Sequence, residues 1–191
     1  MKSNNKLMWG FGIVLGVIVL IVLWYIGTYN SLIKLNENVN NKWAQVETQY
    51  QRRVDLIPNL VNTVKGAANF EQSTLEDITR LRSQWQASST VEQKVSTANQ
   101  IESALSKLLL VAENYPQLTA TKNYQALQDE LANTENKVAV ERGRYNDAVR
   151  DFNARINTFP SNIVAKNHLG YTDRTYFNAK AGAENAPEVK F

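Results

Sequence analysis

Apolar residues run almost without interruption through the first part of the chain, from Leu7 to Ile26. No charged residue stands between Lys6 and Lys34. At about 1.5 Å of rise per residue, a helix over residues 7–26 is roughly 30 Å long, which matches the hydrocarbon thickness of a bilayer. Trp9 and Trp24 stand near its two ends, where amphipathic rings favour the headgroup region. The pattern predicts a transmembrane anchor over residues 7–26, preceded by a short flank over residues 1–6.

A cleaved signal peptide is the alternative interpretation of this run. It requires a shorter apolar segment and a small-x-small cleavage site, whereas residues 25–30 read YIGTYN. The charges that flank the run favour an N-terminus inside and the remaining chain on the outer, periplasmic side. Gly12 and Gly16 form a small-xxx-small pair, which either arises by chance or lets two such helices approach closely.

Beyond the anchor, apolar residues recur in steps of three and four from Leu32 to Val64, which is typical of a helix with one buried stripe. Pro58 interrupts this stripe, because proline removes a backbone hydrogen bond and collides with the preceding turn of a helix. If Asp55 caps a new helix, Pro58 falls in its first turn, where its missing N–H would be unpartnered anyway. The sequence therefore predicts a kink or break near Asp55 and helices near residues 30–54 and 56–87, with Gly66 as a weak point in the second.

Two further helices follow. Thr90-Val91-Glu92-Gln93 reads as a capping box that opens a helix near residues 90–115, which Pro116 closes. From Tyr124 to Phe159 the apolar residues keep a heptad rhythm for about five repeats, which predicts a long helix near residues 122–159 before Pro160.

These patterns predict an all-α protein. A long helix cannot bury its stripe alone, so we expect an elongated antiparallel four-helix bundle over residues 30–160. Residues 161–191 break the rhythm but contain apolar residues such as Ile163 and Phe177, and they predict an irregular tail packed partly along the bundle.

Composition narrows the possible functions. The chain has 191 residues, no cysteine and a formal net charge of +3. Without cysteine, disulfides, thiolate metal sites and a cysteine nucleophile are excluded. The basic excess is spread along the chain rather than gathered into a block, which argues against a nucleic-acid partner.

No recognisable catalytic motif accompanies these helices. His168, the single histidine, lies in a polar stretch and is better explained as a solvated residue than as a ligand or base. The carboxylate pairs Glu76-Asp77 and Asp129-Glu130 point about 100° apart on a helix and do not converge on one substrate. We therefore expect no enzyme activity, no cofactor and no metal site.

Arg142 is the polar residue that most needs a structural explanation, because it occupies a seam position of the last long helix. Either its stem covers apolar surface and its guanidinium reaches solvent, or it forms a buried ion pair. Asp55 is the partner that the sequence suggests, since Arg52, Arg53 and Asp55 fall where the first stripe is expected to bend. Such a pair would fix the register of the helices.

Several ordered motifs resemble the LemA family of bacterial envelope proteins, and together they cover nearly the whole chain after the anchor. The motif residues that we expect to be structurally important are Trp43, Arg52, Arg53, Asp55, Pro58, Asn59, Glu135, Asn136, Arg142, Tyr145, Asn146 and Pro160. The chain departs from the usual pattern after Gly66, where Ala67 and Phe70 replace a common aromatic residue and histidine. Any chemistry assigned to that histidine does not carry over.

The resemblance implies a single-pass protein of the bacterial inner membrane whose family has no established enzyme activity. It implies a scaffold or adaptor role, with the lipid bilayer, membrane or envelope proteins and copies of itself as partners. An envelope-stress sensor that passes strain through a bend at Pro58 is the alternative function, and an envelope hydrolase is the least favoured.

Overall fold

The computed structural model describes residues 3–65 and 72–177, and these residues form helices and loops without any strand. The helices are α1 (Ser3–Lys65), α2 (Gln72–Ala87), α3 (Val91–Ala112), α4 (Pro116–Thr119), α5 (Lys122–Asn157) and α6 (Ser161–Asn167). The all-α fold predicted from the sequence is confirmed. Gly66, Ala67 and Phe70 lie outside the described residues.

α1 is one continuous helix through Pro58, so a break near Asp55 is wrong, whereas the alternative of a kink there stays a prediction. On this stretch Val54, Ile57 and Leu60 are fully buried or nearly so, and the buried stripe continues past the proline. Burying each such side chain contributes roughly 1.5–3 kcal/mol, whereas proline in a helix interior costs about 3 kcal/mol. The free energy gained by burying these side chains therefore exceeds the cost of the proline, and the helix continues.

The prediction of a single helix over residues 56–87 is wrong, because its first part belongs to α1, which ends at Lys65, and its second part is α2, which begins at Gln72. The predicted limits of the later helices lie close to those observed. The capping box at the start of α3 is confirmed: the Gln93 amide donates to Thr90 Oγ1 at 3.2 Å, and the Thr90 amide donates to Gln93 Oε1 at 3.4 Å. Pro116 does not directly close α3, which ends at Ala112, but stands first in α4. α5 ends two residues before the predicted limit.

The chain divides into two compact units, and residues of α1 and α5 occur in both. Unit 1 comprises Met1–Lys42 and Asp147–Arg174. Its core contains Leu32, Phe152 and Val164 from α1, α5 and α6. The tail was expected to be irregular, but α6 forms a regular turn of helix because Val164 and Ala165 are buried.

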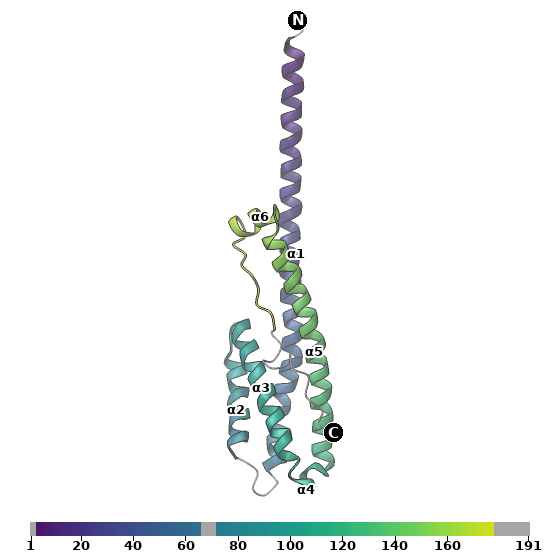
Figure 1. Cartoon of the computed structure of the whole chain (residues 1–191), viewed down its shortest axis with the longest axis vertical. Helices are drawn as coiled ribbons and strands as arrows, with labels where there is room; N and C mark the ends of the chain where they lie inside the picture. Colours follow the sequence, from purple (N-terminus) through teal and green to yellow (C-terminus); the bar gives the residue numbers. More distant parts are fainter. Residues whose placement is uncertain (1–2, 66–71, 178–191) are drawn as a thin grey trace, which may run out of the picture. The chain divides into compact units, whose positions relative to one another are not determined.

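The start of α1 in unit 1 is the one described helix that is long and apolar enough to cross a membrane. Every side chain from Trp9 to Trp24 is exposed in the isolated chain. In Figure 1 this stretch is the bare purple end of α1. Continuous apolar exposure of this kind indicates a membrane protein, since lipid covers what the rest of the chain does not.

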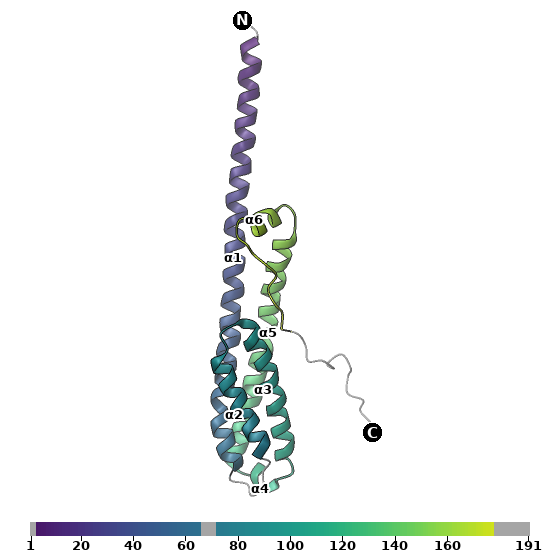
Figure 2. The same cartoon turned by 90° about the vertical axis from the view of Figure 1, so that its left-hand side faces the viewer.

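Unit 2 comprises Trp43–Asn146 with the residues from Thr175, of which the structure describes those up to Phe177. Here α1, α2, α3 and α5 lie side by side (Figures 1 and 2). Each helix places its apolar stripe in a common core, whose largest fully buried side chains include Trp85, Tyr50, Tyr124, Ile78 and Ile101.

Candidate functional site

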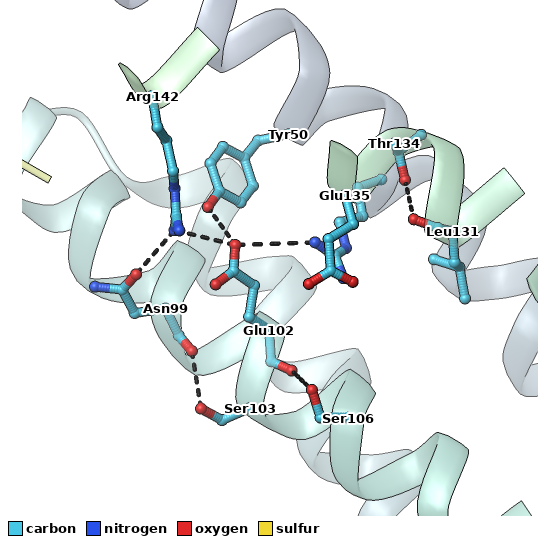
Figure 3. A network of polar contacts seen from close by, with 10 residues as sticks. Tyr50, Asn99, Glu102, Ser103, Ser106, Leu131, Thr134, Glu135 and Arg142 are labelled. Atoms are coloured by element: carbon cyan, nitrogen blue, oxygen red, sulfur yellow. Dashed lines mark hydrogen bonds and ion pairs between the residues drawn. The ribbon is translucent and has the colours of Figure 1, made fainter. Parts of the chain in front are cut away.

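A buried polar cluster lies inside unit 2, surrounded by the apolar core. We call it the Glu102 cluster; it consists of Tyr50 and Arg53 from α1, Asn99 and Glu102 from α3, and Glu135 and Arg142 from α5. Figure 3 shows Tyr50, Asn99, Glu102, Glu135 and Arg142 converging from the three helices. The Glu102 cluster is the one place in the described residues where several charged groups meet inside the protein.

Glu102 is the central acceptor of the cluster. Its Oε1 accepts a hydrogen bond from the Tyr50 hydroxyl at 2.7 Å, and it lies 3.0 Å from Arg142 Nη2 and 3.8 Å from Arg53 Nη1. Glu102 is only 7% exposed. Removing a carboxylate from water is costly, and the cluster offsets that cost with two cations and a hydroxyl donor.

Each of the two arginines has a second partner, although Arg53 Nε, Arg53 Nη1 and Arg142 Nε donate no hydrogen bond within the described residues. Arg142 Nη2 also donates to Asn99 Oδ1 at 2.9 Å, and Arg53 Nη2 lies 3.4 Å from Glu135 Oε2. Glu135 is mostly solvent-exposed, so its pair with Arg53 is weakened by water. The cluster holds two positive and two negative side chains and is electrically neutral.

Burial raises the pKa of the Tyr50 hydroxyl well above its usual range, and the neighbouring Glu102 carboxylate raises it further, against the opposing influence of Arg142. The hydroxyl therefore stays protonated at neutral pH and donates to Glu102. A phenol held in this state serves as a hydrogen-bond donor rather than as a nucleophile or base.

An aromatic group adjoins the cluster and encloses Phe177 of the tail. The Phe177 ring stacks on Trp43 at 5.8 Å between centroids and meets the Tyr145 ring edge-on at 5.7 Å. The Arg142 guanidinium lies 4.7 Å from the Phe177 centroid, in cation–π range. Arg142 thus contacts the tail as well as Glu102.

The tail backbone is fixed next to this ring by a side chain of α5. Asn146 Nδ2 donates to the Phe177 carbonyl and Asn146 Oδ1 accepts from the Phe177 amide, both at 2.9 Å. The Tyr145 hydroxyl donates to the Thr175 carbonyl at 3.0 Å. These bonds satisfy backbone groups of an extended segment that has no neighbouring strand.

A groove on the surface of unit 2 runs between α2 and α3, with a volume of about 430 Å³. Asp77 and Arg80 stand on one side, paired at 3.2 Å, and Lys107 stands on the other. Asn99 lines this groove and also accepts from Arg142. The buried cluster and the open groove therefore share a residue.

The structure places the predicted motif residues in two groups. Arg53, Arg142 and Glu135 belong to the Glu102 cluster, whereas Trp43, Tyr145 and Asn146 hold the tail. The remaining predicted motif residues are Arg52, Asp55, Asn59, Asn136 and Pro160, all exposed, and Pro58, half-buried in α1. Their structural importance stays a prediction.

The predicted ion pair between Asp55 and Arg142 is wrong. Asp55 is exposed and its Oδ1 accepts a hydrogen bond from Gln51 on the preceding turn of α1. Arg142 pairs with Glu102 instead. Asp55 lies on the opposite side of the helix from the buried stripe, because the helix continues without the expected break.

Sequence reasoning missed Tyr50, Asn99 and Glu102 as members of the site. The burial of Glu102 was predictable, because it lies on the buried stripe of α3 that Ala98, Ile101 and Leu105 define. A carboxylate at a stripe position requires a partner, as does the seam arginine of α5. Matching the two polar residues that interrupt apolar stripes would have identified the pair.

Residues considered for catalysis or metal binding lie elsewhere and do not converge. His168 is exposed and its ring meets Tyr25. Asp77 pairs with Arg80, and Glu76 accepts from Gln72. Within residues 3–65 and 72–177, no group of three His, Cys, Asp or Glu side chains is arranged to hold a metal ion.

An apolar helix that can cross a bilayer and a helical unit built on a buried ion cluster define a membrane-attached helical protein. The sequence profile of the LemA family matches residues 42–191. The chain belongs to the LemA family, as its motifs predicted.

Known relatives agree with this assignment. Protein LemA of Metamycoplasma hominis is 30% identical over 147 residues, which cover 74% of this chain and 65% of that protein, just under two thirds of its length. Magnetosome protein MamQ 2 of Paramagnetospirillum magneticum is 24% identical over 196 residues, covering 87% of this chain and 72% of the relative. MamQ of Magnetospirillum gryphiswaldense is 22% identical over 182 residues, which cover 82% of this chain and 66% of that protein. None of these names is that of an enzyme, and the chain is a membrane-associated protein of a bacterial envelope family.

Proposed function

We propose that this protein is a non-enzymatic scaffold of the bacterial inner membrane that presents a helical surface to protein partners on the periplasmic side. The observation that carries the proposal is that the polar groups of unit 2 form two sets, one buried in the core and one exposed on the surface. Arg53 and Arg142 both pair with Glu102 inside the core. A second set of polar groups, which includes Asp77, Arg80 and Gln100, is open to solvent and lines a groove between α2 and α3.

The buried cluster supports an architectural role. Tyr50, Arg142 and Arg53 all face one carboxylate, which leaves Glu102 poorly placed to accept a proton from a substrate. Buried ion pairs of this kind fix which residues face one another more effectively than they add stability. The cluster thereby holds α1, α3 and α5 in one register and determines the surface that they display.

The α2–α3 groove supports a partner-binding role. Arg80 is held by Asp77 on one side and by Gln84 on the other, so its guanidinium is already ordered before a partner arrives. Ordered charged groups give specificity to a protein interface at low entropic cost. Leu81 and Ala104 add apolar surface within the same groove.

Site-specific photocrosslinking in native membranes tests this proposal. A photoreactive residue at Gln100, which lines the groove, is expected to give a discrete adduct that weakens when Arg80→Glu is added. Gln128, an exposed glutamine on α5, is the matched control and is expected to give no such adduct. Adducts that are equal at both positions, or absent at Gln100, contradict the proposal.

Copies of the same chain are a second class of partner. Gly12 and Gly16 lie on one face of the apolar helix, and a Cβ at either would meet nothing within 4 Å, so a second helix has room to approach. We expect Gly12→Leu with Gly16→Leu to convert dimers into monomers in mild detergent, as measured by native mass spectrometry. Gly10→Leu, about 200° around the helix from Gly12, is the control. A wild-type chain that is monomeric throughout contradicts self-association.

A further inference from the structure

Two large apolar side chains project from the loop that joins α5 to α6 and from the first turn of α6, which together we call the α5–α6 turn. Phe159 is 75% exposed and Ile163 is 47% exposed. The next residues of α6, Val164 and Ala165, are buried, so α6 packs on unit 1 through one face and turns Ile163 outwards. Isolated exposed apolar residues are common on protein surfaces, and the position of this pair is what gives it meaning.

The turn lies at the end of the apolar segment of α1. His168, which follows α6, places its ring 5.6 Å from the Tyr25 ring. Tyr25 is the first residue after the exposed run from Trp9 to Trp24 whose side chain is partly covered. Figure 2 shows α6 beside α1, just where the bare stretch of α1 ends. The rest of unit 1 thus begins to pack against α1 where the membrane-spanning segment ends.

The charges around the turn suit a lipid headgroup layer. Between residues 154 and 172 the chain contains Arg155 and Lys166, both exposed, and no Asp or Glu; the next residue, Asp173, accepts a hydrogen bond from Asn157 at 2.7 Å. Lys166 lies three residues after Ile163, on the same side of α6. Cations next to exposed apolar side chains are typical of segments that rest on anionic membranes.

We infer that the turn carrying Phe159 and Ile163 inserts into the membrane interface beside the transmembrane helix, with Arg155 and Lys166 at the lipid phosphates. The protein then contacts the bilayer at two places, the span and the α5–α6 turn. This second contact is independent of the groove and of any protein partner.

The chain has no cysteine, so single-cysteine variants test this inference cleanly. Full-length protein is reconstituted into nanodiscs of phosphatidylcholine and phosphatidylglycerol, and the alkylation rate by a charged maleimide is compared for Phe159→Cys and Asn40→Cys. Asn40 is an exposed residue of α1 in the same unit, about 21 Å beyond Ile26 along the helix. Leu20→Cys within the span is the reference for full protection.

Phe159→Cys is expected to react at least several-fold more slowly than Asn40→Cys in nanodiscs and at a similar rate in denaturant. A fluorescent probe at the same positions is expected to be quenched by spin-labelled lipid at residues 20 and 159 but not at residue 40. Equal reactivity of Phe159→Cys and Asn40→Cys in nanodiscs overturns the inference. Because the bare cysteine carries no apolar dye, protection at residue 159 reports the turn itself.

Discussion

Arg142 on α5 and Glu102 on α3 lie 3.0 Å apart, from Nη2 to Oε1, although 40 residues separate them in the sequence. This pair connects two helices in the core of unit 2. The same Arg142 contacts the Phe177 ring of the tail, so one guanidinium links three segments of the chain.

Glu102→Gln and Arg142→Met are each expected to destabilise unit 2 by about 2–4 kcal/mol, because either change leaves a buried charge without its partner. The double variant is expected to cost less than the sum by about 1–3 kcal/mol. Chemical unfolding of the purified protein in mild detergent measures all three values. Asp55→Asn is the control: combined with Arg142→Met it is expected to be additive within about 0.5 kcal/mol. Coupling to Asp55 rather than Glu102 would contradict the observed pairing.

The raised pKa of Tyr50 predicts a loss of stability at high pH. Above about pH 10 the tyrosine of the unfolded chain releases its proton, whereas the buried Tyr50 of the folded protein keeps it. The unfolded state then binds fewer protons, so the free energy of unfolding falls as pH rises, by up to about 1.4 kcal/mol per pH unit from this group. Tyr50→Phe is expected to remove this part of the slope between about pH 10 and 11.5, whereas Tyr176→Phe, at an exposed site, keeps it. An unchanged slope in Tyr50→Phe would disprove the effect.

Asn146→Ala is expected to release the tail from α5. Two hydrogen bonds to the Phe177 backbone are lost, each worth about 1 kcal/mol, so local opening becomes about 10- to 30-fold more frequent. Limited chymotrypsin digestion measures this as faster cleavage after Tyr176 or Phe177. Asn133→Ala on the same helix, whose amide donates to Glu130 three residues earlier, is expected to leave the cleavage rate unchanged. Equal rates in the two variants would show that Asn146 does not hold the tail.

Pro58→Ala is expected to stabilise the protein by about 1–3 kcal/mol, because alanine restores the backbone hydrogen bond to Val54 within a continuous helix. Asn59→Ala, one residue further on and exposed, is expected to change stability by less than about 0.7 kcal/mol. Thermal unfolding compares the two. If Pro58→Ala instead lowers the thermal stability, the proline ring makes contacts whose stabilisation exceeds the cost of the missing hydrogen bond. If Pro58→Ala also alters an envelope-stress response without unfolding the protein, the sensor hypothesis gains support.

Much of the fold was predictable, because apolar spacing dictates which helices form and which face they bury. The heptads from Tyr124 onwards placed α5 within two residues of its observed end, and the Thr90 capping box placed the start of α3. A break at Pro58 was not a correct prediction, because the burial of Ile57 and Leu60 on either side outweighs the local cost of the proline.

The polar cluster was predictable only in part. Arg142 stood out as a charge in an apolar seam, but its partner depends on how α3 is rotated against α5, and spacing within one helix does not give that rotation. Phe177 illustrates the same limit. Asn146 holds the Phe177 backbone by hydrogen bonds, and the Phe177 ring stacks on Trp43. The spacing of apolar residues does not predict these contacts.

We propose that the buried charges of unit 2 fix the positions of its helices, whereas partner binding takes place at the exposed α2–α3 groove. The most direct test is the yield of the Gln100 photoadduct in native membranes for the variant that combines Glu102→Gln with Arg142→Met. This variant removes one charge of each sign from the Glu102 cluster and keeps an acceptor for Tyr50. Provided that its helical content and protease resistance match the wild type, we predict an undiminished adduct. A folded variant that no longer forms the adduct would show that the charges themselves take part in function and would contradict the account.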